Sequence, residues 1–179
     1  MENICKKGKN MKVMVVSPHP DDETLGAGGT LLRLKKEGHQ IYWLNITDAK
    51  EKDGWSASFI KQRKEQIQRV CDFFEFDDTF NLKFPPAKLE MLEKSILIQK
   101  IGSCFQTVEP EWIILPDPND AHSDHKITYE SCISCSKIFR YPYIHRITTM
   151  EILSETDFGR IDNPFVPNYF VNISDYMKS

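Results

Sequence analysis

Short runs of consecutive apolar residues alternate with longer amphipathic segments, and this alternation constrains the fold more than any other feature of the sequence. The runs lie at residues 13–16, 41–46 and 112–115. Unbroken apolar runs of this length are typical of strands buried on both faces of a parallel sheet. The segments predicted to accompany them are helices over about 24–36, 58–74, 89–105 and 125–139, and a strand over 147–153. The sequence therefore predicts a doubly wound α/β sheet, with ligands bound outside the carboxyl ends of its strands.

The length of the chain and the absence of linkers or repeats predict a single domain. The chain has 179 residues, of which we expect 1–11 to form a disordered leader and 12–179 to fold. The net charge of −3 gives neither the basic surface of a nucleic-acid-binding protein nor a polybasic membrane anchor. No apolar run is long enough to span a bilayer, and five scattered cysteines fit a reducing cytosol. We therefore expect a cytoplasmic protein.

Two clusters of histidine and acidic residues follow predicted strands at the same edge of the sheet. They lie at residues 18–23 (PHPDDE) and 122–125 (HSDH). Taken alone, the acids of the first cluster are explained by capping of the next helix, and the second cluster by a solvated turn. Their joint placement favours a metal site, because two histidines and one carboxylate can hold a catalytic zinc ion with one position left for water.

The two clusters resemble those of the LmbE/PIG-L family of zinc-dependent N-deacetylases. Residues 17–29 (SPHPDDETLGAGG) and the later HSDH carry this likeness, which covers about residues 11–175. It implies a Rossmann-like, three-layer α/β sandwich with a mostly parallel sheet. It also implies removal of an acetyl group from an N-acetylated amino sugar or glycoconjugate, by a water bound to Zn²⁺ or Fe²⁺. The implied metal ligands are His19, Asp22 and His125, and the implied general base is Asp21.

Three further residues are candidates for the chemistry or for the substrate. The negative charge that develops on the acetyl oxygen needs a donor, and we expect His122 to supply it, held in the required tautomer by Asp124. Arg63 falls on the core-facing stripe of its predicted helix. A buried guanidinium needs a partner, so Arg63 either forms a structural ion pair or reaches the site and binds sugar hydroxyls, as the resemblance implies.

Other motifs in the sequence give weaker indications of function. Gly26 and Gly28 begin a dinucleotide-binding pattern, but the third glycine is replaced by Leu31, so no dinucleotide cofactor is expected. Glycines within a predicted helix require close packing or a later helix start. Cys132 and Cys135 form one CxxC motif without a second pair, and we interpret them as buried helical thiols.

Two rival functions are compatible with the same clusters. A metal-dependent hydratase or lyase acting on an unsaturated carboxylic acid would use the same site but would need basic residues around it. A sugar-binding or assembly subunit is disfavoured by the intact ligands and base. The chain ends at Ser179, where the family commonly continues with a helix. We therefore expect a domain lacking a terminal helix, or a homo-oligomer whose neighbouring subunit completes the pocket around the small amino-sugar substrate.

Overall fold

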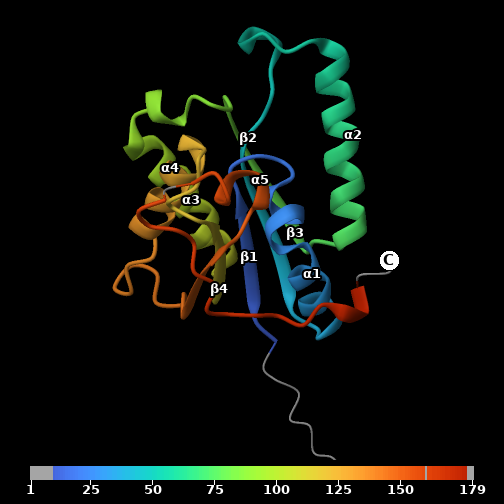
Figure 1. Cartoon of the computed structure of the whole chain (residues 1–179), viewed down its shortest axis with the longest axis vertical. Coiled ribbons are helices and arrows are strands. Elements are labelled where there is room, and N and C mark those ends of the chain that lie inside the picture. Colours follow the sequence, from blue (N-terminus) through green and yellow to red (C-terminus); the bar gives the residue numbers. More distant parts are fainter. Residues whose placement is uncertain (1–9, 160, 177–179) are drawn as a thin grey trace, which may run out of the picture.

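Parallel strands form the centre of the computed structural model, which describes residues 10–159 and 161–176. Within these residues the sheet has five strands in the order β3-β2-β1-β4-β5 (Figure 1). They are β1 (Lys12–Ser17), β2 (Gln40–Thr47), β3 (Asp78–Phe84), β4 (Trp112–Pro116) and β5 (Arg146–Met150). Each of the described pairings is parallel. The predicted α/β class is confirmed, and the sheet is parallel throughout rather than mostly parallel.

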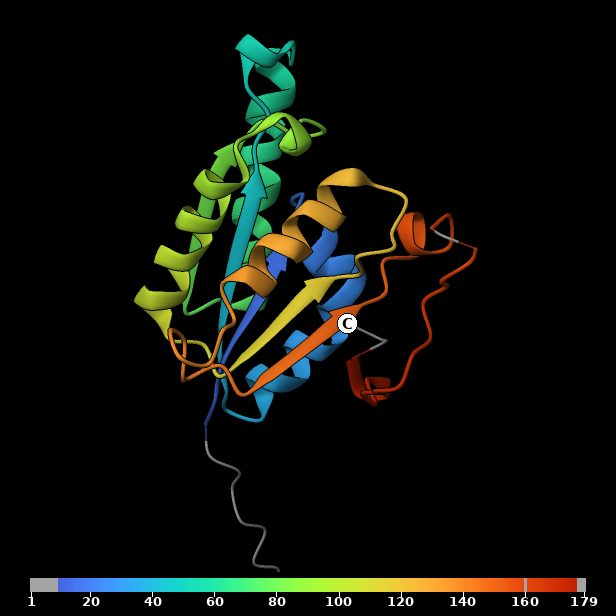
Figure 2. The same cartoon turned by 90° about the vertical axis from the view of Figure 1, so that its left-hand side faces the viewer.

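Helices cover both faces of the sheet and make a three-layer sandwich, as predicted. Helices α1 (Asp22–Lys36) and α2 (Ala57–Phe74) pack on one face, and α3 (Lys94–Val108) and α4 (Ser123–Ser134) pack on the other (Figure 2). The shorter elements are η1 (Glu51–Asp53), η2 (Leu89–Met91), α5 (Leu153–Thr156) and η3 (Ser174–Tyr176). In the described part of the chain, no helix is both long and apolar enough to cross a membrane.

The central strand β1 explains why its sequence is apolar without interruption. Val13 and Val15 face the core beneath α1 and α2, whereas Met14 and Val16 face the core beneath α3 and α4. All four side chains are fully buried. Successive side chains of a strand point to opposite faces, so a strand covered on both sides must be apolar at every position.

Strand β3 is absent from the sequence-based expectation because it lies at the edge of the sheet. Its partly buried residues Phe80, Leu82 and Phe84 alternate with the exposed Asn81 and Lys83. Only one face of this strand meets the core, and its sequence lacks the unbroken apolar run found in β1. The signal that identifies it is an alternation with a period of two.

The helix expected over residues 89–105 is wrong in its first turns. Residues 89–91 form η2, Leu92 is extended, and α3 begins only at Lys94. The amide of Leu89 donates to the Asp124 carboxylate at 3.1 Å, which fixes this turn against α4. The next predicted helix, 125–139, also ends early, at Ser134, where the Cys135 thiol donates to the Ile98 carbonyl oxygen.

The strand order places one edge of the sheet where loops from both halves meet. The chain winds from β1 outward to β2 and β3, then returns through α3 to β4 on the other side of β1. The loops that follow β1 and β4 therefore diverge from neighbouring strands at the point where the order reverses. Ligands bind at such points in open α/β sheets.

Of the expected leader, residues 1–9 lie outside the described residues, while the Met11 carbonyl oxygen accepts from the Gln40 amide.

Candidate metal centre

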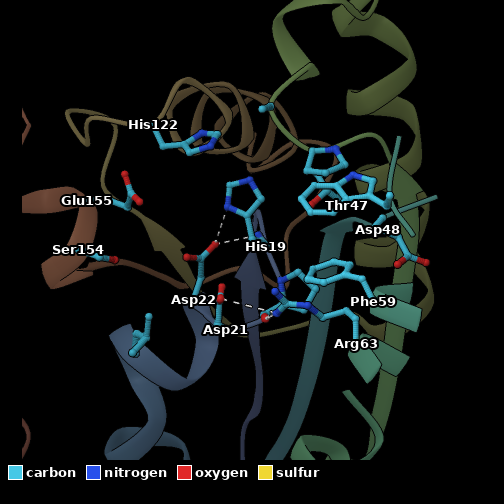
Figure 3. A pocket seen from close by; sticks show the side chains of 16 residues that line it. His19, Asp21, Asp22, Thr47, Asp48, Phe59, Arg63, His122, Ser154 and Glu155 are labelled. Carbon is cyan, nitrogen blue, oxygen red and sulfur yellow. Dashed lines mark hydrogen bonds and ion pairs between the residues drawn. The ribbon is translucent and has the colours of Figure 1, made fainter. Parts of the chain in front are cut away.

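The two histidine clusters converge above the carboxyl ends of β1 and β4. The ring centroids of His19 and His125 are 5.5 Å apart, and those of His19 and His122 are 4.5 Å apart. His19 stands in the turn after β1, whereas His122 caps the N-terminus of α4 and His125 lies in its first turn. The predicted meeting of these distant segments is therefore observed (Figure 3).

One carboxylate oxygen lies between two of these imidazoles. Asp22 Oδ2 is 3.5 Å from His19 Nδ1 and 3.4 Å from His125 Nε2. One donor atom from each of the three residues lies within 4.8 Å of the others, a spacing at which all three could hold one ion. Asp22 and His125 are almost completely buried, and the Asp22 carboxylate also accepts the His19 amide at 2.8 Å. The predicted ligand set is thus brought together.

The hydrogen bonding of His125 suits the space between His125 and Asp22 to a cation. Its Nδ1 lies 2.7 Å from Asp120 Oδ2, so the neutral ring carries its proton on Nδ1 and directs the Nε2 lone pair at Asp22. Among the described residues, His125 Nε2 is buried without a hydrogen-bond partner. Two acceptor atoms that face each other in a buried site require a positive charge between them. A divalent ion bound by imidazole and carboxylate meets that requirement.

Asp124 holds His19, which corrects the expectation that it holds His122. Asp124 Oδ2 lies 3.0 Å from His19 Nε2, and the same carboxylate accepts the amides of Ala87 and Leu89 at 2.7 and 3.1 Å. Burial alone raises the pKa of Asp124, but these hydrogen bonds lower it overall. Because α4 begins at Ser123, the Asp124 side chain turns back over the sheet toward η2 and the β1 loop, whereas His122 remains outside the helix as its cap.

The same contacts favour positive charge at His19. Burial lowers the pKa of His19, but the hydrogen bonds to Asp124 and Asp22 outweigh burial and raise it to about 9. His19, His122 and Asp124 form a second group of close donor atoms. In that group, Asp124 already accepts three hydrogen bonds. The first group, with its orphaned His125 nitrogen, is therefore the better fit for an ion.

Asp21 lies beside Asp22 in the sequence but outside both groups of donor atoms. Its side chain is 54% exposed and lines the cavity in front of the cluster. Burial and the neighbouring charge of Asp22 raise the pKa of Asp21, and the Arg63 guanidinium offsets part of this rise. A carboxylate with a raised pKa, facing a cavity, is suited to accept and return a proton.

Arg63 forms the ion pair that the sequence left open and also reaches the edge of the site, while its binding of sugar hydroxyls stays a prediction. Its Nη1 donates to the Pro20 carbonyl oxygen at 2.6 Å and lies 3.7 Å from Asp21 Oδ2. It therefore forms an ion pair, and it does so at the edge of the site, where it also lines the cavity (Figure 3). The guanidinium fixes the backbone at Pro20, between His19 and Asp21.

His122 presents a hydrogen-bond donor to the cavity. Its Nδ1 accepts the Asp124 amide at 3.1 Å, so the neutral ring carries its proton on the other nitrogen. Burial and the nearby charge of His19 lower the pKa of His122, which keeps the ring neutral at pH 7. The amide of Asp124, rather than its carboxylate, thus selects the tautomer that we expected.

The cavity in front of the cluster has a volume of about 330 Å³. Its remaining walls come from α1, the end of β2 and the loop after it, the start of α2, the loop before η2, and α5. The described residues that line these walls are Leu25, Thr47, Asp48, Ala49, Trp55, Phe59, Pro86, Ala87, Ser154 and Glu155. Such a volume accommodates a small ligand.

Comparison with known families agrees with the residues at this site. The family model described as GlcNAc-PI de-N-acetylase (PIG-L) matches residues 14–136, more than half of the chain, and the match contains both clusters. The chain belongs to the PIG-L family. The resemblance found in the sequence is thereby confirmed.

Individual relatives of this PIG-L protein are deacetylases by name. A diacetylchitobiose deacetylase from Thermococcus kodakarensis is 25% identical over 178 residues, which cover 93% of this chain and 65% of the relative. A probable N-acetyl-alpha-D-glucosaminyl L-malate deacetylase 2 from Bacillus cereus is 29% identical over 121 residues, covering 63% of this chain and 55% of the relative. The chain thus spans less than two thirds of the length of either relative.

A solved structure confirms the PIG-L fold. The conserved protein TT1542 from Thermus thermophilus superimposes with a TM-score of 0.74 at 24% identity, covering 94% of this chain and 74% of that protein.

Sequence reasoning missed three residues that the structure places in or around the site. Asp120 was not singled out, although its position five residues before His125 puts it beside that ring. Trp55 and Phe59 line the cavity but were not singled out. Their spacing of four residues from each other and from Arg63 is the signal that identifies them.

Proposed function

We propose that the protein is a metal-dependent N-deacetylase that hydrolyses the acetamide of an N-acetylated amino sugar. The observation that carries this proposal is the buried, unpartnered Nε2 of His125 facing the carboxylate of Asp22, with His19 beside them and Asp21 at the cavity. Membership of the PIG-L family and the names of the relatives support the choice of substrate.

His19, Asp22 and His125 are the residues that would hold the ion. Two imidazoles and one carboxylate suit Zn²⁺, and Fe²⁺ accepts the same donors. When bound, the ion supplies Lewis acidity that polarises the amide carbonyl and makes water a stronger acid. Asp120 and Asp124 each hold the outer nitrogen of one ligand histidine and so fix its tautomer.

Asp21 is the proposed general base and acid. It removes a proton from the attacking water and returns a proton to the amine as the carbon–nitrogen bond breaks. The products are acetate and the free amino sugar. Arg63 holds the loop at Pro20 and faces the Asp21 carboxylate, which keeps this group beside the ligands while leaving it open to the cavity.

His122 is the proposed donor to the acetyl oxygen. As water adds to the carbonyl carbon, this oxygen becomes negatively charged and gains from a nearby N–H group. The neutral ring of His122, with its outer nitrogen protonated, offers such a group without adding a charge to the resting site.

The alternative of a hydratase or lyase is not favoured by the charges of the cavity. A substrate with several carboxylates needs several cationic partners. Among the described residues that line the cavity, Arg63 is the one guanidinium, no lysine is present, and Arg63 already faces Asp21.

A reducing compartment remains our proposal for the protein, supported by the free thiols of the four cysteines that the structure describes.

The test combines metal analysis with acetate release. We expect about one zinc ion per purified chain, and acetate together with free amine from N-acetylglucosamine or its glycosides. Asp21→Asn should retain the ion but lower kcat by roughly 10²- to 10⁴-fold. Asp72→Asn is the matched control and should behave as wild type. Asp72 is an exposed residue of α2 whose carboxylate accepts a hydrogen bond from the Gln68 side-chain amide. Metal-loaded protein that releases no acetate from any such sugar would refute the proposal.

A further inference from the structure

One wall of the cavity is a continuous stack of two aromatic rings and a guanidinium. The rings of Trp55 and Phe59 are stacked, with centroids 4.7 Å apart and planes inclined by 21°. The guanidinium of Arg63 lies over the ring of Phe59, 5.6 Å from its centroid. The residues are spaced by four, so the stack runs along α2 from the outer rim toward Asp21.

The backbone before α2 places Trp55 on this stack. Gly54 has a φ of 94°, a left-handed conformation that side-chain-bearing residues rarely adopt, and it turns the chain after η1. Ser56 then caps α2 by accepting the Phe59 amide at 3.2 Å. Trp55 is left 39% exposed, although it also lines the cavity. A large ring that stays in water beside a binding cavity has apolar surface available for a ligand.

The charged residues of the cavity indicate which ligand this surface takes. Asp21, Asp22, Asp48 and Glu155 supply four carboxyl groups, against the guanidinium of Arg63, which faces Asp21, and the imidazole of His19, which faces Asp22 and Asp124. A phosphate or carboxylate group attached to the substrate would find no unpaired cationic side chain among the described residues that line the cavity. Uncharged hydroxyl groups, in contrast, find acceptors in these carboxylates and in Thr47.

We propose that the Trp55–Phe59 pair is a binding subsite for the ring of a second, uncharged pyranose linked to the amino sugar that is deacetylated. This inference rests on the proposed function and specifies its substrate as a neutral oligosaccharide. A pyranose of gluco configuration carries its ring substituents equatorially, so its faces expose C–H groups. Such a face packs flat against an aromatic ring while the hydroxyls at its edge reach the polar wall.

The competing explanation is structural. An apolar residue just before a helix cap often packs on the first turn and fixes the entry of the chain. In that case Trp55 would contribute to thermal stability and would not discriminate between sugars. The two explanations therefore differ in what a substitution of Trp55 changes.

Intrinsic fluorescence tests sugar binding directly. All three tryptophans lie in the described part of the chain, and Trp43 and Trp112 are only 2% exposed. A change of emission on adding N,N′-diacetylchitobiose to zinc-loaded Asp21→Asn protein therefore reports on Trp55. We expect a saturable change of emission with sugar concentration. The change should disappear in the double variant with Asp21→Asn and Trp55→Phe, because phenylalanine retains an aromatic ring but lacks the emission of tryptophan. A signal that survives Trp55→Phe, or no signal at sugar concentrations that saturate wild-type turnover, would overturn the subsite.

Steady-state kinetics supply the second test. Trp55→Ala should raise KM for N,N′-diacetylchitobiose about tenfold more than KM for N-acetylglucosamine, because only the disaccharide reaches the stack. Trp55→Phe should retain most of the preference. Phe73→Ala removes an exposed aromatic ring at the far end of α2 and should leave both KM values as in the wild type. Equal effects of Trp55→Ala on both sugars would refute the proposal, and should Trp55→Ala fail to fold, Trp55→Phe and the emission signal still decide it.

The two experiments separate this inference from the proposed function. If the wild type releases no acetate while the disaccharide still changes the Trp55 emission, the deacetylase proposal fails and the subsite stands. If acetate is released and substitution of Trp55 leaves the preference for the disaccharide unchanged, the subsite fails and the deacetylase proposal stands.

Discussion

At the scale of single residues, His125 is held so that only one of its ring nitrogens is available for binding. Asp120 takes Nδ1 at 2.7 Å, and Nε2 faces Asp22. The carboxylate also makes the imidazole a stronger electron donor through the hydrogen bond. Asp120 is itself buried, at 8% exposure, so this contact is protected from competition with water.

We predict that Asp120→Asn weakens zinc binding by roughly 10- to 100-fold. An amide lacks the charge that favours the proton on Nδ1, and its NH₂ group can donate to that nitrogen and move the proton to Nε2. Competition with a chromophoric chelator measures the affinity without reference to turnover. Asp117→Asn is the control in the same turn, since its Oδ1 accepts only the nearby Asn119 amide. An equal loss of affinity in both variants would mean that the turn, and not the Asp120–His125 bond, is responsible.

At the scale of elements, close packing explains Gly26 and Gly29 of α1, and a later helix start explains none of its glycines. The helix begins at Asp22, ahead of all of them. A Cβ atom on Gly29 would lie 2.6 Å from Ile173 Cδ1 and 3.0 Å from Ile173 Cβ, whereas one on Gly28 would meet nothing nearer than 3.5 Å. Gly29 thus allows the C-terminal segment to lie directly against α1.

Two alanine substitutions should therefore have opposite effects on stability. Gly28→Ala should raise the free energy of unfolding by up to about 1 kcal/mol, because alanine is the better helix former and fits the space. Gly29→Ala should lower it by about 1–3 kcal/mol, because Ile173 must move. Urea denaturation measures both. Stabilisation by Gly29→Ala would show that the C-terminal segment does not hold its position against α1.

The elements that sequence alone predicts are those whose surroundings are uniform. Strand β1 is covered on both faces, so its four apolar residues identify it without knowledge of its neighbours. The edge strand β3 and the break before α3 depend on contacts with residues far away in the sequence. The break is fixed by the bond from Leu89 to Asp124, which are 35 positions apart. Such a contact cannot be predicted from the local sequence pattern.

The candidate site shows the same limit. The meeting of the two histidine clusters was predictable because both lie at strand ends, where topology brings them together, whereas the choice of His19, Asp22 and His125 came from the family resemblance. The partner of Asp124 was not identifiable, because its carboxylate turns toward His19 while only its backbone amide reaches His122. Residue type and spacing predict which side chains gather at an edge, but not how their hydrogen bonds are shared.

At the scale of the whole molecule, the proposed ion would connect the two halves of the sheet. Its proposed ligands come from the loop after β1, from the first residue of α1, and from α4, which follows β4. Unfolding separates these segments and removes the site, so binding to the folded state alone stabilises it.

Zinc should accordingly raise the melting temperature. At a free concentration about 100 times Kd, the expected stabilisation is about 2.7 kcal/mol, or a rise of roughly 5–10 °C for a chain of this size. Differential scanning fluorimetry with and without zinc measures this rise, and His125→Ala should abolish it. A wild-type melting temperature that does not respond to zinc would contradict the assignment of the ligands.

The loop between β2 and α2 carries Trp55 but none of the three residues assigned to the ion. On these two proposals, Trp55 and the residues that hold the ion lie in separate stretches of sequence. Exchanging residues 48–56 for the matching loop of another family member would therefore change the proposed sugar subsite, with the proposed ion ligands left in place at the ends of β1 and β4.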